Sequence, residues 1–397
     1  MINSEMLRYG RTKSCIRALY EFGLQRAAVV GKEHVYDYSL GNPSVPTPPE
    51  IADTIRELLN MEPLALHGYT TASGDRDARE AVAADLRRRT NDDIRAENIF
   101  FTCGAAPALI SVFRALAVED AEVILLAPYF AEYPVFTSAN GMKPVVVPAD
   151  TRDFLLHPDQ VEPYLTPHTQ AVIVNSPNNP AGVVYSRESL EKLGRLLTRK
   201  SEEYGHPIYI IADEPYRELA YDGEDAPYIP AIYPNTVICY SYSKSLSMPG
   251  ERIGYICVPP CAADSADLYA AVAGAARTLG HVCAPSLMQR VIGLNTKLRP
   301  DMASYDRNRL RLYLDLSDMG YRCIKPKGAF YMLVEAPDGN SLNFSERAKA
   351  HDLLLVPADD FGCPGFVRLS TCVHYDMILR SLPAFRALAA EYGLKSL

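Results

Sequence analysis

The run YSYSKSLSMPGERIGY, residues 240–255, holds the side chains with the clearest chemical use. Lys244 comes just after an apolar run, has serines on both sides, and is followed eight residues later by Arg252. A lysine that is partly desolvated at a strand end has a lowered pKa, and its neutral amine can form an imine with an aldehyde. Hydroxyls and a guanidinium beside it can bind a phosphate, so Ser241, Ser243 and Arg252 are candidate phosphate-binding residues. A surface lysine in a serine-rich loop is the alternative, and the GERIGY that follows argues against it.

Two other apolar runs, IIADEPY and AVIVNSPNNPAG, also end in polar side chains. In the first, Asp213 and Tyr216 offer a carboxylate and a phenol from one turn. A carboxylate keeps a pyridine nitrogen protonated, and a phenol can donate to an oxygen on the same ring. In the second, Asn179 offers an amide within a sharp turn. Each residue alone could be an ordinary turn or capping residue, but together with Lys244 they predict a site for a pyridine that bears an aldehyde.

Two further segments could bind anions. In FFTCGAAPAL, Ala105 and Ala106 open a helix after Gly104, and Pro107 suits the first helical turn. Free backbone N–H groups at a helix start bind anions. In FVRLST, Arg368 stands in the middle of an apolar strand. A buried arginine needs a partner, which is either an acidic residue of this chain or the carboxylate of a ligand.

These residues need a sheet to position them, because most of them follow short β-rich runs. The six runs are NIFFTCGA, AEVILLAPYF, AVIVNSPNNP, IYIIADEPY, TVICYSYSK and RIGYICVP. Helical segments such as PALISVFRALAVED and SRESLEKLGRLLTRKSEEYG separate several of them. This alternation predicts an α/β fold with a mostly parallel sheet flanked by helices. Such sheets bind ligands at the carboxyl ends of their strands.

The pattern changes near residue 286. Residues 286–320 form a long charged helical stretch, and the strands KGAFYMLVEAP and GFVRLSTCV then precede a final helix, which predicts a smaller α+β unit. The first 45 residues end in the proline-rich SLGNPSVPTPP and are predicted to pack with this unit. We therefore expect a large domain over residues 46–285 and a small domain made of residues 1–45 and 286–397. A chain of 397 residues is long enough for both.

The composition excludes several classes of protein. Hydrophobic residues make up 48% and charged residues 22%, as in ordinary globular proteins. The formal net charge of −8 gives no electrostatic basis for binding nucleic acid or an anionic membrane. No apolar run reaches the ~20 residues of a membrane span, and the N-terminus has no apolar signal core, so we expect a cytoplasmic protein. The nine cysteines are scattered, which favours free thiols, and no metal is expected.

The order of these motifs resembles that of the class I/II aminotransferases, the fold type I group of pyridoxal 5′-phosphate (PLP) enzymes. The resemblance extends over nearly the whole chain. It includes a GNP loop, an HGY tyrosine, the helix start after Gly104, the aromatic of APYF, the loop NPAG, the pair DEPY, SYSK with its arginine, and RLS.

The resemblance implies that PLP is the cofactor and that Lys244 holds it as a Schiff base and transfers the substrate proton. It implies Asp213 as the partner of the ring nitrogen, and Tyr216 and Asn179 as the pair that bonds the ring oxygen. The remaining implied contacts are Ala105, Ala106, Ser241, Ser243 and Arg252 at the phosphate, Phe130 or the less favoured Tyr129 stacked on the ring, and Arg368, Gly41 and Asn179 at the substrate carboxylate. Tyr69 would reach the phosphate of the other subunit in a homodimer.

The expected reaction moves the amino group of an L-amino acid to a 2-oxo acid through a Lys244 aldimine. A carbon–sulfur β-lyase, or an eliminase similar to aminocyclopropane-carboxylate synthases, would use the same carbanion and the same motifs. A non-catalytic ligand-sensing module is a third alternative, and the complete set of acid, base and carboxylate-binding residues argues against it.

The sequence departs from the family pattern in two places. Ala105 and Ala106 stand where relatives commonly have Ser or Thr, so hydroxyl groups are missing from the phosphate loop. The segment TLGHVCAPS lacks the arginine of dicarboxylate-specific relatives, although Arg277 lies one or two positions away. The side chain of the substrate therefore stays open.

Overall fold

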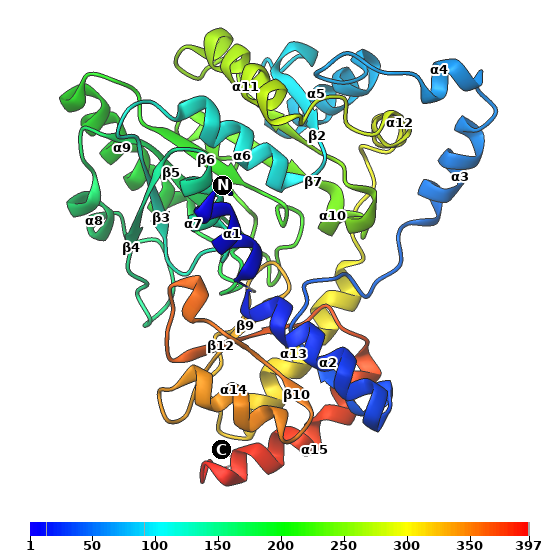
Figure 1. Ribbon diagram of the computed structural model, residues 1–397, viewed down its shortest axis with the longest axis vertical. Helices are drawn as coiled ribbons and strands as arrows, with labels where there is room; N and C mark the ends of the chain where they lie inside the picture. The colour runs from blue at the N-terminus through cyan, green and yellow to red at the C-terminus, as the bar shows by residue number, and fades with distance from the viewer. Residues whose placement is uncertain (13, 91, 396–397) are drawn as a thin grey trace.

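The computed structural model describes residues 1–12, 14–90, 92–395 (Figure 1). The helices are α1 Ser4–Arg11, α2 Cys15–Val30, α3 Pro49–Leu58, α4 Pro63–His67, α5 Arg76–Thr90, α6 Ala105–Leu116, α7 Tyr133–Ala139, α8 Pro158–Val161, α9 Arg187–Tyr204, α10 Tyr242–Ser245, α11 Ser265–Leu279, α12 Ser286–Leu294, α13 Met302–Asp318, α14 Ser341–Lys349 and α15 Tyr375–Glu391. The strands are β1 Tyr36–Asp37, β2 Ile99–Thr102, β3 Glu122–Leu126, β4 Lys143–Val147, β5 Thr169–Asn175, β6 Tyr209–Asp213, β7 Thr236–Ser241, β8 Gly254–Cys257, β9 Tyr331–Glu335, β10 Leu353–Leu354, β11 Val356–Pro357 and β12 Phe366–Ser370.

A seven-stranded sheet forms the centre of the larger part of the molecule, in the order β2-β8-β7-β6-β5-β3-β4. The pairs among β3, β4, β5, β6 and β7 are parallel, and β8 runs antiparallel to both of its neighbours. The predicted α/β class with a mostly parallel sheet is therefore confirmed. All six β-rich runs noted in the sequence became strands of this sheet, and β4 was not predicted.

Helices cover both faces of the sheet, because alternate residues of the central strands enter two separate hydrophobic cores. On β5, Val172 and Val174 pack in the core that includes leucines of α9, whereas Ala171 and Ile173 pack in the core that includes α6 and α11. A strand buried on both faces must be apolar along its whole length. This explains why the charged residues of the parallel strands, Glu122, Lys143 and Asp213, stand at a first or last position.

The smaller part of the molecule contains β9, β11 and β12, with α13, α14 and α15 packed around them (Figure 1). The N-terminal segment reaches this part, since β1 pairs in parallel with β10 through Tyr36 and Leu353. The pairing also joins Asp37 to Leu354, so residues 36–37 contact the C-terminal unit. The proposed domain boundaries at residues 45/46 and 285/286 remain a prediction.

The prediction of one helical stretch over residues 286–320 is wrong in one respect. The structure divides it into α12 and α13, with a break that contains Pro300. Proline has no N–H to continue a helix, and Asp301 begins the next helix by accepting a hydrogen bond from the Ser304 amide at 3.1 Å. The break lets α12 pack with α3 and α5 while α13 packs with α15.

Within the residues that the structure describes, no helix is long and apolar enough to cross a membrane. All nine cysteines have free thiols.

Candidate active site

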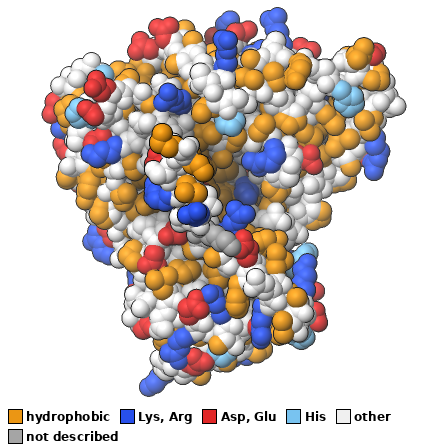
Figure 2. Space-filling model, in the orientation of Figure 1, with side chains coloured by type: hydrophobic (Ala, Val, Ile, Leu, Met, Phe, Trp, Pro, Cys, Tyr) orange, Lys and Arg blue, Asp and Glu red, His pale blue; other side chains and the backbone are white. Residues whose placement is uncertain are grey.

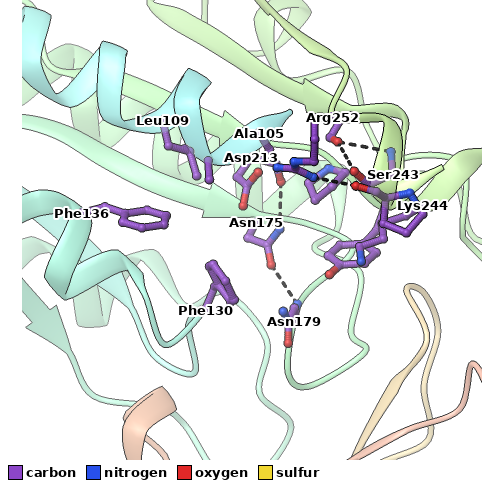
Figure 3. Close-up of a pocket in the computed structure, with 15 residues that line it drawn as sticks. Ala105, Leu109, Phe130, Phe136, Asn175, Asn179, Asp213, Ser243, Lys244 and Arg252 are labelled. Carbon is purple, nitrogen blue, oxygen red and sulfur yellow. Dashed lines mark hydrogen bonds between the residues drawn. The ribbon is translucent and has the colours of Figure 1, made fainter. Parts of the chain in front are cut away.

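A pocket opens at the carboxyl ends of the parallel strands. Figure 2 shows the hollow in the face of the molecule, between the larger and the smaller part, with Lys and Arg side chains around it. The residues that line the pocket are Ala105, Ala106, Leu109, Phe130, Phe136, Asn175, Asn179, Asp213, Pro215, Tyr216, Ser241, Ser243, Lys244, Pro249 and Arg252 (Figure 3). Ten of the predicted site residues are therefore brought together from five segments of the sequence.

The register of the sheet places the polar strand ends side by side. Asn175 at the end of β5 pairs with Asp213 at the end of β6, and the Asn175 side chain donates to the Asp213 carbonyl at 2.8 Å. The other end of the same amide accepts from the Asn179 N–H at 2.8 Å. Asn175 was not singled out in the sequence, although it begins the NSPNNP loop, and it sets the position of Asn179.

Lys244 lies on the single turn of α10 with no carboxylate among its described contacts. Its Nζ donates to the Gly41 carbonyl at 2.6 Å and lies 5.7 Å from the centroid of the Phe330 ring. Burial lowers the pKa of the Lys244 amine, and the guanidinium groups of Arg368 and Arg252 lower it further. A larger fraction of the amine is therefore neutral and nucleophilic than in an exposed lysine.

The Asp213 carboxyl is buried and has only one of its oxygens paired. Oδ2 accepts from the hydroxyl of Tyr133 at 2.5 Å, and Oδ1 is buried without a partner. Burial raises the pKa of Asp213 to about 7, and the hydrogen bond from Tyr133 opposes that rise. A free carboxylate oxygen that faces a pocket suits a cationic N–H of a ligand. Tyr133 was missed in the sequence, although it lies only three residues after Phe130.

Arg368 is buried, with 2% of its surface exposed, and no acidic side chain pairs with it among the described residues. It donates to Asn179 Oδ1 at 3.2 Å and to the Ser39 carbonyl at 2.5 Å, and its Nε is buried without a partner. The rings of Tyr331 and Phe361 lie 4.6 and 4.9 Å from the guanidinium carbon. The structural salt bridge considered as an alternative is absent among these residues, which leaves the fork available to a carboxylate ligand.

The end of the pocket that could bind an anion such as phosphate is formed by the start of α6 and by Arg252. No side chain caps α6, so the N–H groups at Ala105 and Ala106 stay available. Gly104 has φ +97°, and a Cβ at this position would lie 2.9 Å from Arg252 Nη2. Glycine therefore permits both the turn and the close approach of the guanidinium.

Aromatic rings line the rest of the site. Phe130 faces the pocket, whereas the buried Tyr129 ring packs beside Gly362, which favours Phe130 as the stacking residue. The hydroxyls of Tyr216 and Tyr331 lie 3.2 Å apart. Tyr331 was missed in the sequence because its run was interpreted only as a strand.

Gly41 and Arg368 join the pocket through the contacts with Lys244 and Asn179. Tyr69 does not, since it lies outside the pocket of its own chain with 97% of its surface exposed.

The available groups fit PLP. The pocket combines an amine of lowered pKa, an unpaired carboxylate oxygen on Asp213, and uncapped amides beside an arginine. These suit the aldehyde, the ring nitrogen and the phosphate, respectively. The sheet and this site together define the fold type I class of PLP enzymes.

The comparisons with known proteins identify the family. The family described as aminotransferase class I and II matches residues 33–382. The chain is 31% identical over 356 residues to the aspartate/prephenate aminotransferase of Thermus thermophilus. This alignment covers 87% of this chain and 88% of the relative. Among solved structures, an aminotransferase from Eubacterium rectale has a TM-score of 0.96 at 51% identity and covers 99% of each chain. The aspartate aminotransferase of Thermus thermophilus with maleate has a TM-score of 0.85 at 27% identity, covering 98% of this chain and 99% of the other.

This chain belongs to the class I and II aminotransferases and uses PLP to transfer amino groups. The β-lyase, eliminase and ligand-sensing alternatives are not favoured, because the relatives reported above are named as aminotransferases.

Proposed function

We propose that Lys244, Asp213 and Arg368 carry the transfer of an amino group from an α-amino acid to a 2-oxo acid. The observation that supports this most directly is Arg368, a buried arginine with a free Nε and a hydrogen bond to Asn179 at the edge of the Lys244 pocket. A carboxylate bound there would place its Cα toward Lys244. Tyr331 and Gly41, which lie between Arg368 and Lys244, would bound the space for the substrate.

Different residues of the chain would then have different roles in the reaction. PLP, when bound, supplies an electrophilic aldehyde carbon and a ring that accepts electrons from the substrate Cα. The Lys244 amine would serve as the nucleophile toward that aldehyde and as the base for the proton on the substrate Cα. The Asp213 carboxylate would hold a proton on the ring nitrogen, and Asn179 and Tyr216 would donate to the ring oxygen. The phosphate would be held by Ala105, Ala106, Ser241, Ser243 and Arg252, and Phe130 would stack on the ring.

A screen of single half-reactions tests this function. We expect the visible absorption band of the holoenzyme to bleach with an amino acid alone, to release one equivalent of 2-oxo acid, and to return when a second 2-oxo acid is added. Aspartate and aromatic amino acids are included because named relatives act on them. Pyruvate formed continuously from a β-substituted amino acid, without any added 2-oxo acid, would instead indicate elimination.

The hydrogen bond from Tyr133 lowers the pKa of the buried Asp213 carboxyl. Removing the hydroxyl in Tyr133→Phe raises the pKa of Asp213 further above about 7, so at pH 7 a larger share of the carboxyl is neutral. A hydrogen bond to a charged group contributes about 1.5–3 kcal/mol, so PLP affinity at pH 7 is expected to fall about tenfold or more. The loss becomes smaller as the pH rises and the carboxyl ionises.

Titration of the apoenzyme with PLP between pH 6 and 9 measures this effect. Tyr38→Phe is the matched control, because the Tyr38 hydroxyl is buried and bonded to Ser381 at 2.6 Å, away from the pocket. A Tyr133→Phe protein with the pH dependence of the wild type would contradict the assigned role.

We propose that two copies of the chain form a dimer with shared sites. Exposed apolar side chains gather on and after the arm formed by α3 and α4, which projects from one side of the molecule (Figure 1). They are Leu59 at 57% exposure, Leu64 at 82% and Tyr69 at 97%. Apolar groups in such an arm suit burial against a second copy. Tyr69 would then reach the phosphate site of the partner.

Mixing two inactive variants tests this arrangement. Tyr69→Ala supplies an intact Lys244, and Lys244→Ala supplies an intact Tyr69, so a mixed dimer has one complete site. After subunit exchange, activity is expected to reach about a quarter of the wild-type value, because half of the dimers are mixed and half of their sites are complete. Lys244→Ala mixed with Arg368→Met is the control that stays inactive, since both residues act in the same chain. No recovery in the first mixture would overturn the shared site.

A cytoplasmic location also remains a proposal. The nine free thiols support it, because a reducing compartment keeps cysteines unpaired.

A further inference from the structure

The turn that carries Lys244 is too short to hold its own position. The helix α10 has four residues, and a single helical turn is unstable without packing. At its start, Ser241 accepts a hydrogen bond from the Ser243 amide at 3.2 Å. At its end, Ser245 lies beside a buried phenol, with its Oγ 2.8 Å from the hydroxyl of Tyr240. Ser245 belongs to the serine-rich run of the sequence, and no function above uses it.

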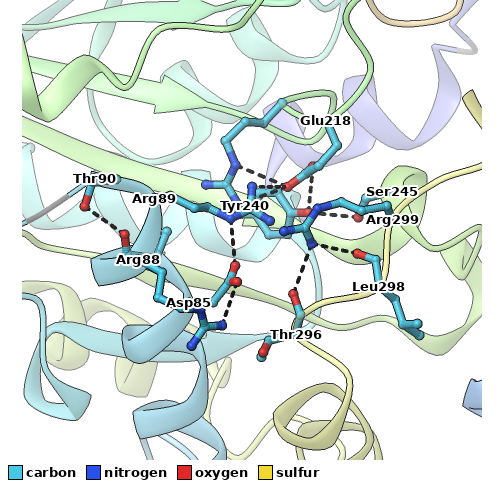
Figure 4. A network of polar contacts seen from close by, with 12 residues as sticks. Asp85, Arg88, Arg89, Thr90, Glu218, Tyr240, Ser245, Thr296, Leu298 and Arg299 are labelled. Atoms are coloured by element: carbon cyan, nitrogen blue, oxygen red, sulfur yellow. Dashed lines mark hydrogen bonds and ion pairs between the residues drawn. The ribbon is translucent and has the colours of Figure 1, made fainter.

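Tyr240 connects this turn to the segment that follows Asp213. Its hydroxyl donates to Glu218 Oε2 at 2.9 Å (Figure 4), and Glu218 lies two residues after Tyr216. The tyrosine has one proton, and an ionised carboxylate can only accept. Tyr240 therefore donates to Glu218 and accepts from Ser245, so the direction of both hydrogen bonds is fixed.

Two arginines keep Glu218 ionised although it is buried. Arg217 and Arg89 lie 3.3 and 3.2 Å from Glu218 Oε1. Burial raises the pKa of Glu218, but the two guanidinium groups, the hydrogen bond from Tyr240 and a backbone hydrogen bond all lower it, and the net shift is downward. Arg217 also lies 4.3 Å from the centre of the Tyr240 ring and pairs with Glu214 at 3.1 Å. The acceptor at the end of the chain of hydrogen bonds is thus a fixed, charged group.

We propose that Ser245, Tyr240 and Glu218, here called the Tyr240 bridge, are positioning residues that hold the Lys244 amine in place relative to Asp213 and Tyr216. The bridge links the two segments on which these residues lie, and no member of it lines the substrate side of the pocket at Arg368. The inference rests on the proposed role of Lys244. A loose α10 turn would leave the amine displaced from the atoms that it must reach.

Tyr240→Phe and Ser245→Ala test the bridge. The phenylalanine keeps the ring that stacks on Tyr255 at 5.0 Å, so the fold is retained. A small misplacement of a reacting group costs up to about 10²-fold in rate, and we expect each variant to lower kcat about tenfold. KM for the amino acid should be unchanged, because Arg368 is untouched. The kcat of the double variant should be no lower than that of either single variant, because each single substitution already breaks the same bridge.

A second readout does not depend on turnover. Desolvation lowers the pKa of the Lys244 nitrogen, and a looser turn admits water. In the apoenzyme, the pH midpoint at which the Lys244 amine becomes neutral, measured from the pH dependence of PLP binding, is therefore expected to rise in both variants. Tyr233→Phe is the matched control, because its hydroxyl is buried and donates to the Ile208 carbonyl at 2.6 Å outside the bridge. It should lose stability without moving the midpoint.

Borohydride reduction followed by peptide mass analysis separates this inference from the proposed function. PLP found covalently on Lys244 in the wild type supports the function, and its absence there would refute the function itself. With Lys244 labelled, a Tyr240→Phe protein that has the kcat and midpoint of the wild type, and loses only stability as Tyr233→Phe does, would overturn the positioning role.

Discussion

Lys244→Ala is expected to lower kcat by at least about 10⁴-fold, because the chain loses both its nucleophile and its base in one change. No described side chain offers a second amine in the pocket, since Lys244 is the only lysine among the residues that line it. The measurement is a single-turnover assay with the amino acid found in the half-reaction screen. Lys244→Arg should be equally inactive, because it keeps a positive charge but not a neutral amine.

Stability provides an independent check on Lys244. Its folded-state pKa lies below the ordinary value of 10.5, so between these two pH values the unfolded chain binds more protons than the native one. The free energy of unfolding of the wild-type apoenzyme should therefore rise with pH in that window, and this rise should be missing in Lys244→Met. Lys192→Met is the control, because Lys192 is exposed and paired with Glu188 on α9.

For activity, a Lys244→Ala enzyme with normal transamination would refute the assignment of Lys244 as nucleophile and base.

Arg368→Met is expected to lower kcat/KM by about 10²-fold or more, while PLP stays bound with its usual spectrum. Truncating one partner of a buried, hydrogen-bonded charge pair costs about 2–5 kcal/mol, and about 1.4 kcal/mol is a factor of ten. Because Arg368 has no acidic partner among the described residues, the apoenzyme should not lose stability. Arg368→Lys should recover little, since an ammonium cannot present the planar fork.

Arg309 is a matched control for Arg368. Both arginines are buried, with 1% and 2% exposure, but Arg309 pairs with Asp222 at 2.5 Å and Asp306 at 2.6 Å. Arg309→Met should lower the free energy of unfolding by about 1.5–3 kcal/mol, because it removes charged hydrogen bonds to Asp222, to Asp306 and to the Pro326 carbonyl, and it should leave KM nearly unchanged. Equal effects of the two substitutions on KM and on stability would show that Arg368 is structural.

The sequence predicted the parts of the site that are local. Asp213 and Lys244 follow apolar strands directly, so their place at the carboxyl edge of the sheet follows from strand periodicity and parallel topology. The partner of Arg368 was left open, because a buried arginine is compatible with any of the acidic residues until the fold excludes them. Its ring neighbours Tyr331 and Phe361 come from two other segments.

The missed residues act through contacts that only the fold creates. Tyr133 reaches Asp213 across 80 positions of the chain, and the Tyr240 bridge requires Glu218 and Ser245 to meet. The two short strands β10 and β11 were also missed, since two residues carry no periodicity. The division of α12 from α13 could have been anticipated from Pro300, because proline ends a helix.

The pairing of β1 with β10 has a consequence for synthesis of the chain. Tyr36 leaves the ribosome early but can pair only after Leu353 has emerged, whereas β2 through β8 lie between residues 99 and 257. Closing so long a loop is slow compared with local pairing. The large sheet can therefore assemble during translation, while the first residues of the protein wait, unpaired, for the last tenth or so of the chain.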